Sequence, residues 1–400
     1  MLQGIKGISL THYLQGPSCV QYLADLGADV TKIEKIGGAY ERHWSGAESY
    51  VDDQSVFYLL AGRNQKSIEL NMKDPRGAKI LWDLLAESDV LVEKFRPGAL
   101  DRLGFTAEAI AAHNPRLIFC SLSGFGSRGP LAGEPGQDLL IQSISGLMDL
   151  TGPANSAPTP VGTAIVDQHG ATLGALGIPA ALFRREKTGQ GCRVDASLLA
   201  AALNLQIEPL SYYLNGTELY PKSANSLGSR FHQAPYGAYE TADGWITISL
   251  SASEALAKGL GITELAGLTR EDQFRDRERI SSLVADALRG SSTAAWLEEL
   301  PKLGIWCAPI QGYDAIVDHP QVLANDSFLS TTLANGATAK LLAHPISYDG
   351  QVPGIHTAPP LAGEHTSEVL DSLGYTQEQI DALLAEGAVG ASSQLGSVPK

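Results

Sequence analysis

Gly162-Thr163-Ala164-Ile165-Val166-Asp167-Gln168-His169-Gly170 is the stretch around which the chain is organised, and it leads into the apolar segment 171–183. Small and β-branched residues at 162–166 are followed by the acidic residue Asp167. A basic run at 184–187 precedes Gly189. This pattern predicts a strand, an acidic corner and then a helix with a basic last turn and a glycine stop. Ligands bind at such corners in open α/β sheets. Asp167 is therefore either a helix N-cap or a functional carboxylate.

Short apolar runs alternate with helical patterns along the first 200 residues. We expect strands at residues 4–10, 29–34, 63–70, 90–95, 116–122 and 192–195. Helices are expected from Gly16-Pro17 to about Leu26, after Asp74-Pro75, and near residues 366–387. Strands that alternate with helices form parallel βαβ units. The sequence therefore predicts an α/β fold with a doubly wound parallel sheet.

The length of the chain predicts a second, smaller domain, because 400 residues are too many for one compact core. Residues 237–248 indicate a β-hairpin with an Asp-Gly turn, and helical patterns follow to about residue 300. We expect a large α/β domain over 1–215, completed by 331–400, and a small α+β domain over 216–330.

Composition and charge exclude several classes of protein. The net charge of −15 argues against binding to nucleic acid or to an anionic membrane. No apolar run reaches the roughly 18 residues of a membrane span, and the N-terminus lacks the pattern of a secretory signal. The cysteines, Cys19, Cys120, Cys192 and Cys307, are far apart, which suggests neither a disulfide framework nor a metal site. We expect a cytoplasmic enzyme with no bound metal.

Gly124-Phe125-Gly126-Ser127-Arg128-Gly129 matches the G-x-G-x-x-G pattern of dinucleotide-binding proteins and follows an expected strand. In that motif a helix must begin at once, so that its N-terminus faces the pyrophosphate. Pro130, Gly133 and Pro135 follow instead. We therefore expect a loop beside a site and no NAD.

Basic residues in the first domain fall at the ends of expected strands or in the loops beside them. They are Lys35, Arg63, Lys66, Lys94, Arg96 and Arg102. Strand ends of a parallel sheet share one edge, so these side chains predict a local cationic rim on an acidic protein. Such a rim suits phosphate groups, although any single residue could be a solvated loop charge.

Six motifs in order resemble the class III CoA-transferases, which are the formyl-CoA transferase-like, CaiB/BaiF-type enzymes. The resemblance extends from Leu14-Gln15-Gly16-Pro17 to about Leu373. The motifs lie at residues 63–68, 94–105, 124–130, 162–167, 187–191 and 359–366. The resemblance implies the predicted fold, two chains threaded into an interlocked homodimer, and acyl-CoA and small carboxylates as substrates, with no tightly bound cofactor.

The resemblance also implies a chemical mechanism. An aspartate at the position of Asp167 attacks the donor thioester to form a mixed anhydride, and CoA thiolate then gives an aspartyl-CoA thioester. The acceptor carboxylate attacks that thioester, which divides one hard step into easier ones. Glycines at Gly170 and in the loop 124–129 are candidates for letting backbone N–H groups approach the developing oxyanions.

Further site residues follow from the same resemblance. Gln15 matches a family side chain beside the reacting carboxylate, although on its own it could simply cap the next helix. The residues assigned to CoA binding are Lys35, Lys94, Phe95, Arg102 and Gln137. Lys35 and Arg102 would meet the phosphates. Lys94 stands where formyl-CoA transferase has asparagine.

Two departures bear on the subfamily. The related α-methylacyl-CoA racemases have a Gly-His-Asp segment, and here it is Gly136-Gln137-Asp138. Glutamine cannot take up a proton, so racemase is the less favoured alternative, together with a non-catalytic acyl-CoA-binding protein.

The glycine-run lid of formyl-CoA transferase is also missing near residues 231–237. That absence favours an acceptor larger than oxalate, such as itaconate, mesaconate or a glutarate derivative, with succinyl-CoA as donor. Candidates for its distal carboxylate are Arg42, His43, Arg230 and His232.

Overall fold

The computed structural model describes residues 1–392 and divides the chain into two compact units. Unit 1 comprises residues 1–141, 164–202 and the chain from 321 onward, whereas unit 2 comprises 142–163 and 203–320. The expected domain boundaries at residues 215 and 330 each lie within about a dozen residues of a unit boundary. The larger difference from the expected domains is the segment 142–163. It was expected in the large domain over 1–215, but it belongs to unit 2.

Unit 1 is built on a seven-stranded sheet with the strand order β15-β5-β2-β1-β6-β7-β8. The strands are β1 (Lys6–Leu10), β2 (Asp29–Glu34), β5 (Gln65–Leu70), β6 (Val90–Glu93), β7 (Ile118–Ser123), β8 (Cys192–Ser197) and β15 (Val389–Gly390). All neighbours pair in parallel except β15, which is antiparallel to β5. The prediction of a parallel-dominated α/β sheet is confirmed. The order reverses direction between β1 and β6, which is where ligands bind in such sheets.

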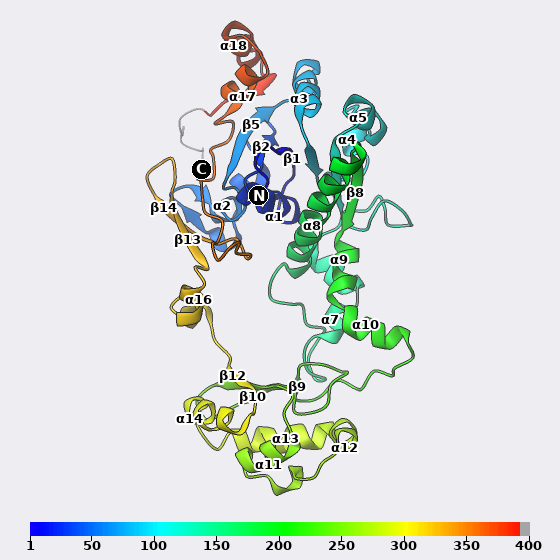
Figure 1. Cartoon of the computed structure of the whole chain (residues 1–400), viewed down its shortest axis with the longest axis vertical. Helices are drawn as coiled ribbons and strands as arrows, with labels where there is room; N and C mark the ends of the chain where they lie inside the picture. The colour runs from blue at the N-terminus through cyan, green and yellow to red at the C-terminus, as the bar shows by residue number, and fades with distance from the viewer. Residues whose placement is uncertain (393–400) are drawn as a thin grey trace. The chain divides into compact units, whose positions relative to one another are not determined.

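Helices cover both faces of this sheet. On one face α1 (Gln15–Asp25) and α8 (Ile165–Thr188) pack against each other and bury Val92, Cys120 and Leu122. On the other face α3 (Pro75–Glu87), α5 (Ala107–His113), α17 (Thr366–Ser372) and α18 (Gln377–Ala385) bury Leu91 and Phe119. Figure 1 shows α17 and α18, from the end of the chain, close to β5 and α3 near its beginning.

Glycines allow α8 to lie unusually close to its neighbours. A Cβ at Gly170 would lie 2.5 Å from Nε2 of Gln15, and one at Gly174 would lie 3.0 Å from Sγ of Cys19. The first distance is shorter than real Cβ contacts and the second is tighter than most of them, so both positions favour glycine where α8 meets α1. The helix ends as predicted, at Gly189 in the left-handed conformation with φ 72°.

The expected strand before Asp167 is wrong, because α8 already begins at Ile165. Asp167 is the third residue of the helix, and the N-cap is Ala164, which has no side chain able to cap. Asp167 is therefore neither a strand-end corner nor an N-cap. A short apolar run such as Ala164-Ile165-Val166 cannot distinguish a strand from a buried helical turn.

The remaining elements of unit 1 complete its edges. They are the 3₁₀ turns η1 (Tyr40–Arg42) and η2 (Gly46–Glu48), the hairpin β3 (Tyr50–Val51) and β4 (Gln54–Ser55), α2 (Val56–Leu59), α4 (Ala99–Arg102), α16 (Pro320–Ala324), and the hairpin β13 (Phe328–Thr332) and β14 (Thr338–Leu342). The single helix expected near 366–387 is instead two, α17 and α18, separated at Gly374 with φ 86°. Of the predicted tail, residues 393–400 lie outside the described residues.

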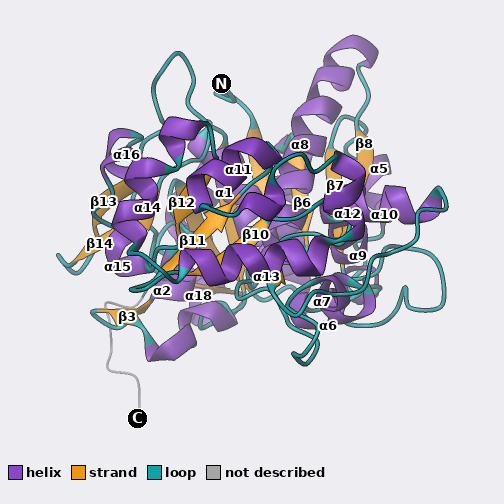
Figure 2. Cartoon of the chain, turned by 90° about the horizontal axis from the view of Figure 1, so that it is seen from below, coloured by secondary structure: helices purple, strands orange, loops and turns teal. Residues whose placement is uncertain are grey.

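Unit 2 contains a four-stranded antiparallel sheet in the order β12-β11-β10-β9. The strands are β9 (Ser226–Leu227), β10 (Gly237–Glu240), β11 (Trp245–Ile248) and β12 (Cys307–Pro309). The predicted hairpin with the turn at Asp243-Gly244 is confirmed. Figure 2 shows α13 (Arg277–Leu288) across the strands, and it contacts β10.

The other helices of unit 2 pack around this sheet or precede it. They are α7 (Leu147–Leu150), α10 (Ile207–Leu214), α11 (Ser253–Leu260), η3 (Thr263–Leu265), α12 (Arg270–Arg275), α14 (Thr293–Glu299), η4 (Pro301–Leu303) and α15 (Tyr313–Ile316). Two helices, α6 (Asp138–Ile144) and α9 (Leu198–Leu205), connect the units. Within residues 1–392, no helix is both long and apolar enough to cross a membrane.

Candidate active site

The loops after β1 and β6 meet the first turn of α8 at the point where the strand order reverses. Gln15 follows β1, and Lys94 and Phe95 follow β6. The N–H of Lys94 donates to the carbonyl of Leu10 at 3.1 Å, which joins the ends of the two strands. The fold therefore brings Gln15, at the start of α1, and the loop that carries Lys94 to the first turns of α8, the helix that carries Asp167.

Asp167 is a half-buried carboxyl group with an unusual proton affinity. Burial is the main cause that raises the pKa of Asp167 to about 6, while Lys94 opposes the rise and the charge of Asp138 adds to it. The pKa of Lys94 is lowered, chiefly by burial, although Asp167 and Glu93 oppose that change. Titratable groups with displaced pKa values and an opposing charge are typical of functional sites.

Asp138 holds the first turn of α8. Its Oδ2 accepts the N–H of Val166 at 2.8 Å and the N–H of Asp167 at 2.9 Å. These N–H groups have no partner within a helix, so a side chain from elsewhere must supply one. The carboxylate of Asp138, at the start of α6, therefore takes the capping role that the side chain of Ala164 cannot fill.

Gln15 is fully buried beside α8. Neither its amide oxygen nor its amide nitrogen has a hydrogen-bond partner among the described residues. Its Nε2 lies against Gly170, one turn after Asp167. Gly170, expected to let a backbone N–H approach an oxyanion, instead leaves space for the side-chain amide of Gln15. A buried amide without partners costs free energy unless a ligand completes it.

The sequence interpretation missed His12, which directly follows β1. Its ring centroid lies 5.0 Å from that of Phe95. Burial is the main cause that lowers the pKa of His12 to about 4, assisted by Lys32 and Lys94. The next residue, Tyr13, has φ 62°, a strained conformation for a residue with a bulky side chain. The sequence feature that could have identified His12 is its position just after the carboxyl end of the first strand.

Three other predicted residues are exposed and lie farther along the same edge or beside it. Lys35 follows β2, Arg102 ends α4 in the loop after β6, and Gln137 precedes α6. Lys35 and Arg102 lie beyond the carboxyl ends of β2 and β6, on the sheet edge where the cationic rim was expected. Gln137 lies next to Asp138, the residue that binds the first turn of α8.

Arg63 and Lys66 do not belong to the cationic rim, which corrects the prediction. They lie at the amino end of β5, on the edge opposite to Lys35 and Lys94. Arg63 is 2% exposed and forms a bidentate ion pair with Asp25 at 2.9 and 2.7 Å. Lys66 pairs with Asp29 at 3.6 Å and with Glu368 at 3.2 Å.

Two of the four candidates for a distal carboxylate have partners in unit 1. Arg42 forms a bidentate pair with Glu34 at 2.7 and 2.6 Å and also donates to the hydroxyl of Tyr58. Because of this guanidinium, which outweighs the effect of burial, the pKa of Glu34 is lowered to about 2. His43 contacts the carbonyl of Gly37. Arg42 is therefore a structural residue and not a substrate-binding one.

The G-x-G-x-x-G loop has a structural role. Residues 124–137 contain no helix, as predicted. A Cβ at Gly124 would lie 2.5 Å from Cα of Gly136, so both positions require glycine. This backbone crossing places the segment that follows, including Asp138, beside the end of β7.

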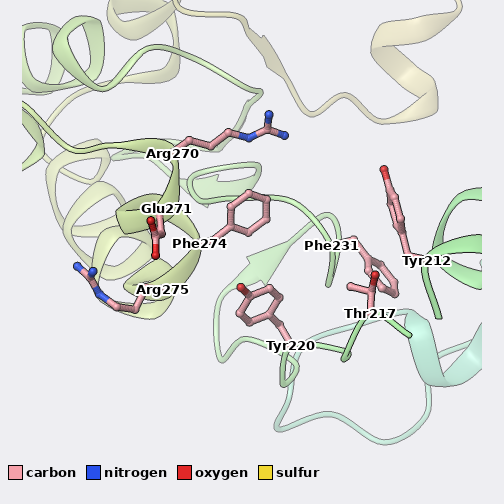
Figure 3. A pocket seen from close by; sticks show the side chains of 8 residues that line it. All are labelled: Tyr212, Thr217, Tyr220, Phe231, Arg270, Glu271, Phe274 and Arg275. Atoms are coloured by element: carbon pink, nitrogen blue, oxygen red, sulfur yellow. The ribbon is translucent and has the colours of Figure 1, made fainter. Parts of the chain in front are cut away.

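Each unit also contains a cavity. In unit 1, about 330 Å³ lies at the ends of β6, β7 and β8, and its walls include Glu93, Phe95, Ser121 and Arg193. In unit 2, about 810 Å³ is bounded by Tyr212, Thr217, Tyr220, Phe231, Arg270, Glu271, Phe274 and Arg275. Figure 3 shows the rings of Tyr220 and Phe274 near each other in this cavity. The described residues contain no cluster of three or more His, Cys, Asp or Glu side chains suited to a metal ion.

Comparison with known proteins identifies the family of the chain. The model of CoA-transferase family III matches residues 2–366. The human succinyl-CoA:glutarate CoA-transferase is 31% identical over 97% of this chain and 90% of its own length. The acetyl-CoA:oxalate CoA-transferase of Acetobacter aceti is 34% identical over 82% of this chain and 85% of its own. A crystal structure of a CaiB/BaiF family protein from Brucella suis superimposes with a TM-score of 0.81 at 29% identity, covering 93% of this chain and 99% of that one. The predicted resemblance is confirmed: the chain belongs to CoA-transferase family III and is a CoA-transferase.

Proposed function

We propose that this protein transfers CoA between two carboxylic acids through covalent intermediates on Asp167. The observation that carries the proposal is the carboxyl group of Asp167, half-buried with a pKa of about 6 and opposed by the charge of Lys94, on a helix that meets the unpartnered amide of Gln15 one turn later, at Gly170. A carboxylate of raised basicity is a better nucleophile, and it is still ionised at neutral pH.

The reaction proceeds by four acyl exchanges. Asp167 attacks the thioester carbonyl, the C–S bond breaks, and CoA leaves as thiolate from a mixed anhydride. The thiolate attacks the aspartyl carbonyl, which releases the donor acid and leaves an aspartyl-CoA thioester. The acceptor carboxylate then expels CoA thiolate to form a second anhydride. Attack of the thiolate on the acceptor acyl group releases the new thioester and restores the carboxylate of Asp167.

Gln15 is placed to assist these steps. Its amide N–H is a donor with no partner, so it can hydrogen-bond an oxygen on the reacting carbonyl without first breaking another bond. Lys94 supplies a positive charge that favours the ionised carboxylate of Asp167. Phe95 lies beside the neutral ring of His12 and offers an apolar wall for the pantetheine arm.

For substrates we propose succinyl-CoA as donor and a dicarboxylate, such as glutarate, itaconate or mesaconate, as acceptor. The name of the human relative includes glutarate, which supports a longer dicarboxylate, whereas that of the Acetobacter relative includes oxalate, the shortest dicarboxylate. In unit 2, Arg230 pairs with Asp149 at 3.4 Å and His232 contacts Glu208 at 3.3 Å. Each of these two candidates for the distal carboxylate therefore has a carboxylate partner within unit 2.

A trapping experiment tests the covalent mechanism. The protein is incubated with succinyl-CoA, quenched with hydroxylamine, digested and analysed by mass spectrometry. Hydroxylamine converts an activated carboxyl group into a hydroxamate, so a mass change on Asp167 is expected. Binding of acyl-CoA with no such change, together with exchange of the α-proton of a 2-methylacyl-CoA in deuterated water, would indicate the racemase alternative.

The acidic limb of the pH profile should report Asp167. We expect kcat/KM to fall about tenfold for each pH unit below an apparent pKa of about 6, because only the ionised carboxylate attacks. The sign follows from burial, which raises the pKa of Asp167 and so brings the loss of activity to a higher pH than for an ordinary aspartate. Rates measured from pH 4.5 to 8 check this, and a limb near pH 4 would contradict it.

Arg102→Ala should weaken binding of CoA without affecting the chemistry. A guanidinium that meets a phosphate forms charge-assisted hydrogen bonds, each contributing about 1.5–3 kcal/mol. We therefore expect KM for succinyl-CoA to rise by at least about tenfold with kcat nearly unchanged. Arg116→Ala is the matched control, because Arg116 is an exposed arginine just before the amino end of β7. Equal effects of the two substitutions would refute a phosphate contact at Arg102.

We propose that the protein is an interlocked homodimer. Large apolar side chains are exposed on three helices: Leu139, Leu140 and Ile144 on α6, Leu176 and Phe183 on α8, and Ile207, Tyr213 and Leu214 on α10. Contact with a second chain would bury such side chains on each helix. Light scattering at micromolar concentration should give twice the chain mass of 42.3 kDa, and a monomer would contradict the proposal.

A further inference from the structure

The first turn of α8 depends on a residue that is distant in sequence. Its N-cap, Ala164, has no polar side chain, yet the turn carries the proposed nucleophile. Asp138, 8% exposed at the start of α6, accepts two of its N–H groups with a single oxygen, at 2.8 and 2.9 Å. The direction of the Cα–Cβ bond of Asp167 is thus fixed from outside its own helix.

We propose that Asp138 is a positioning residue for the transferase reaction, which holds the backbone of Asp167 in place through two hydrogen bonds to the first turn of α8. This inference rests on the proposed function of Asp167. A helix N-terminus normally stabilises a nearby carboxylate through its free N–H groups and its dipole. Because Asp138 occupies those N–H groups and adds a negative charge, that stabilisation is largely cancelled at Asp167.

The groups around Asp167 support this assignment. Lys94, from the loop after β6, is the opposing charge, and Asp138, from α6, is the like charge. The neighbouring helix α1 presents the neutral amide of Gln15 beside Gly170. The crossing of Gly124 and Gly136 explains how the chain brings Asp138 to this place.

Two substitutions separate the two effects of Asp138. Asp138→Asn retains an oxygen that can accept the two N–H groups but removes the charge, whereas Asp138→Ala removes both. We expect Asp138→Ala to lower kcat/KM by about 10- to 100-fold, since small displacements of a reacting group cost this much. Asp138→Asn should keep more of the rate, while the acidic limb of its pH profile moves to lower pH.

Substitutions of Asp74 are the matched controls. Asp74 caps α3 by accepting the N–H of Arg76 at 2.9 Å, so the matched variant for Asp138→Ala is Asp74→Ala, which removes a helix cap away from the site, and Asp74→Asn is matched to Asp138→Asn. We expect both Asp74 variants to keep the wild-type rate and pH profile. If Asp74→Ala reproduced the effects of Asp138→Ala, the proposal would be overturned in favour of a general loss of stability.

Hydrogen exchange gives a readout that does not require activity. In Asp138→Ala the amides of Val166 and Asp167 should exchange faster in a peptide spanning residues 162–172, and in Asp138→Asn they should remain more protected. Unchanged exchange in Asp138→Ala, or an unmoved acidic limb in Asp138→Asn, overturns the role of Asp138. Failure of the proposed function is recognised separately, because wild-type protein would then form no hydroxamate on Asp167.

Discussion

Replacing Asp167 by asparagine is expected to lower kcat/KM for CoA transfer by about four to six orders of magnitude, the range seen when an enzyme loses its nucleophile. Asparagine has nearly the same shape, but its amide cannot form the mixed anhydride. Because the backbone of residue 167 is held by Asp138, the substitution should leave the first turn of α8 in place. The initial rate of succinyl-CoA consumption with an acceptor acid measures the effect.

Two controls make the result on Asp167 specific. Binding of acyl-CoA should change by no more than a few-fold, and the hydroxamate should be absent after trapping. Asp314→Asn, an exposed aspartate in the first turn of α15, should retain wild-type activity. If Asp167→Asn kept more than about 1% of the activity, or if trapping labelled another residue, Asp167 would not be the nucleophile.

Arg63→Leu should lower the free energy of unfolding by about 3–5 kcal/mol, because it leaves the buried carboxylate of Asp25 without its partner. Both side chains are almost inaccessible, at 2% for Arg63 and 0% for Asp25. Arg63 also donates to the carbonyl of Leu342 at 2.8 Å, so the substitution loosens the chain's return to unit 1. Urea denaturation at fixed protein concentration is the measurement.

The double substitution Arg63→Leu with Asp25→Leu tests the cause. Two apolar residues of suitable volume can replace a buried ion pair at little cost, so much of the stability should return. Lys79→Ala, which removes an exposed pair with Asp83, should cost only about 0.5 kcal/mol. If Arg63→Leu were as stable as Lys79→Ala but had a raised KM for acyl-CoA, the original assignment of Arg63 to a phosphate site would be restored.

Local patterns were sufficient for the elements of the sheet. The run 29–34 became β2 with the predicted bounds, and Asp74-Pro75 began α3 with Asp74 as the cap. The turn at Asp243-Gly244 formed the predicted hairpin. In each case the controlling interactions lie within a few residues, such as the alternation of side chains, a cap or the backbone freedom of glycine. Such features can be read without knowledge of the rest of the chain.

The strand expected before Asp167 was wrong because its conformation depends on a distant residue. The run 164–166 is compatible with a strand or with a helical turn, and the choice depends on what satisfies its N–H groups. The groups are satisfied by Asp138, which is 28 and 29 residues away from the two donors. No local pattern contains that information.

The sequence by itself determined the parallel α/β sheet, the family and the identity of the candidate nucleophile, because these depend on local periodicity and on motifs in a fixed order. Only the tertiary structure decided which charged residues face the site. It paired Arg63 with Asp25, 38 residues earlier, and Arg42 with Glu34, and it placed Gln15 and Asp138 against the first turns of α8. Burial and ion pairing are properties of residues that meet only after the sheet has formed, so the chemistry of each charge is decided by the fold.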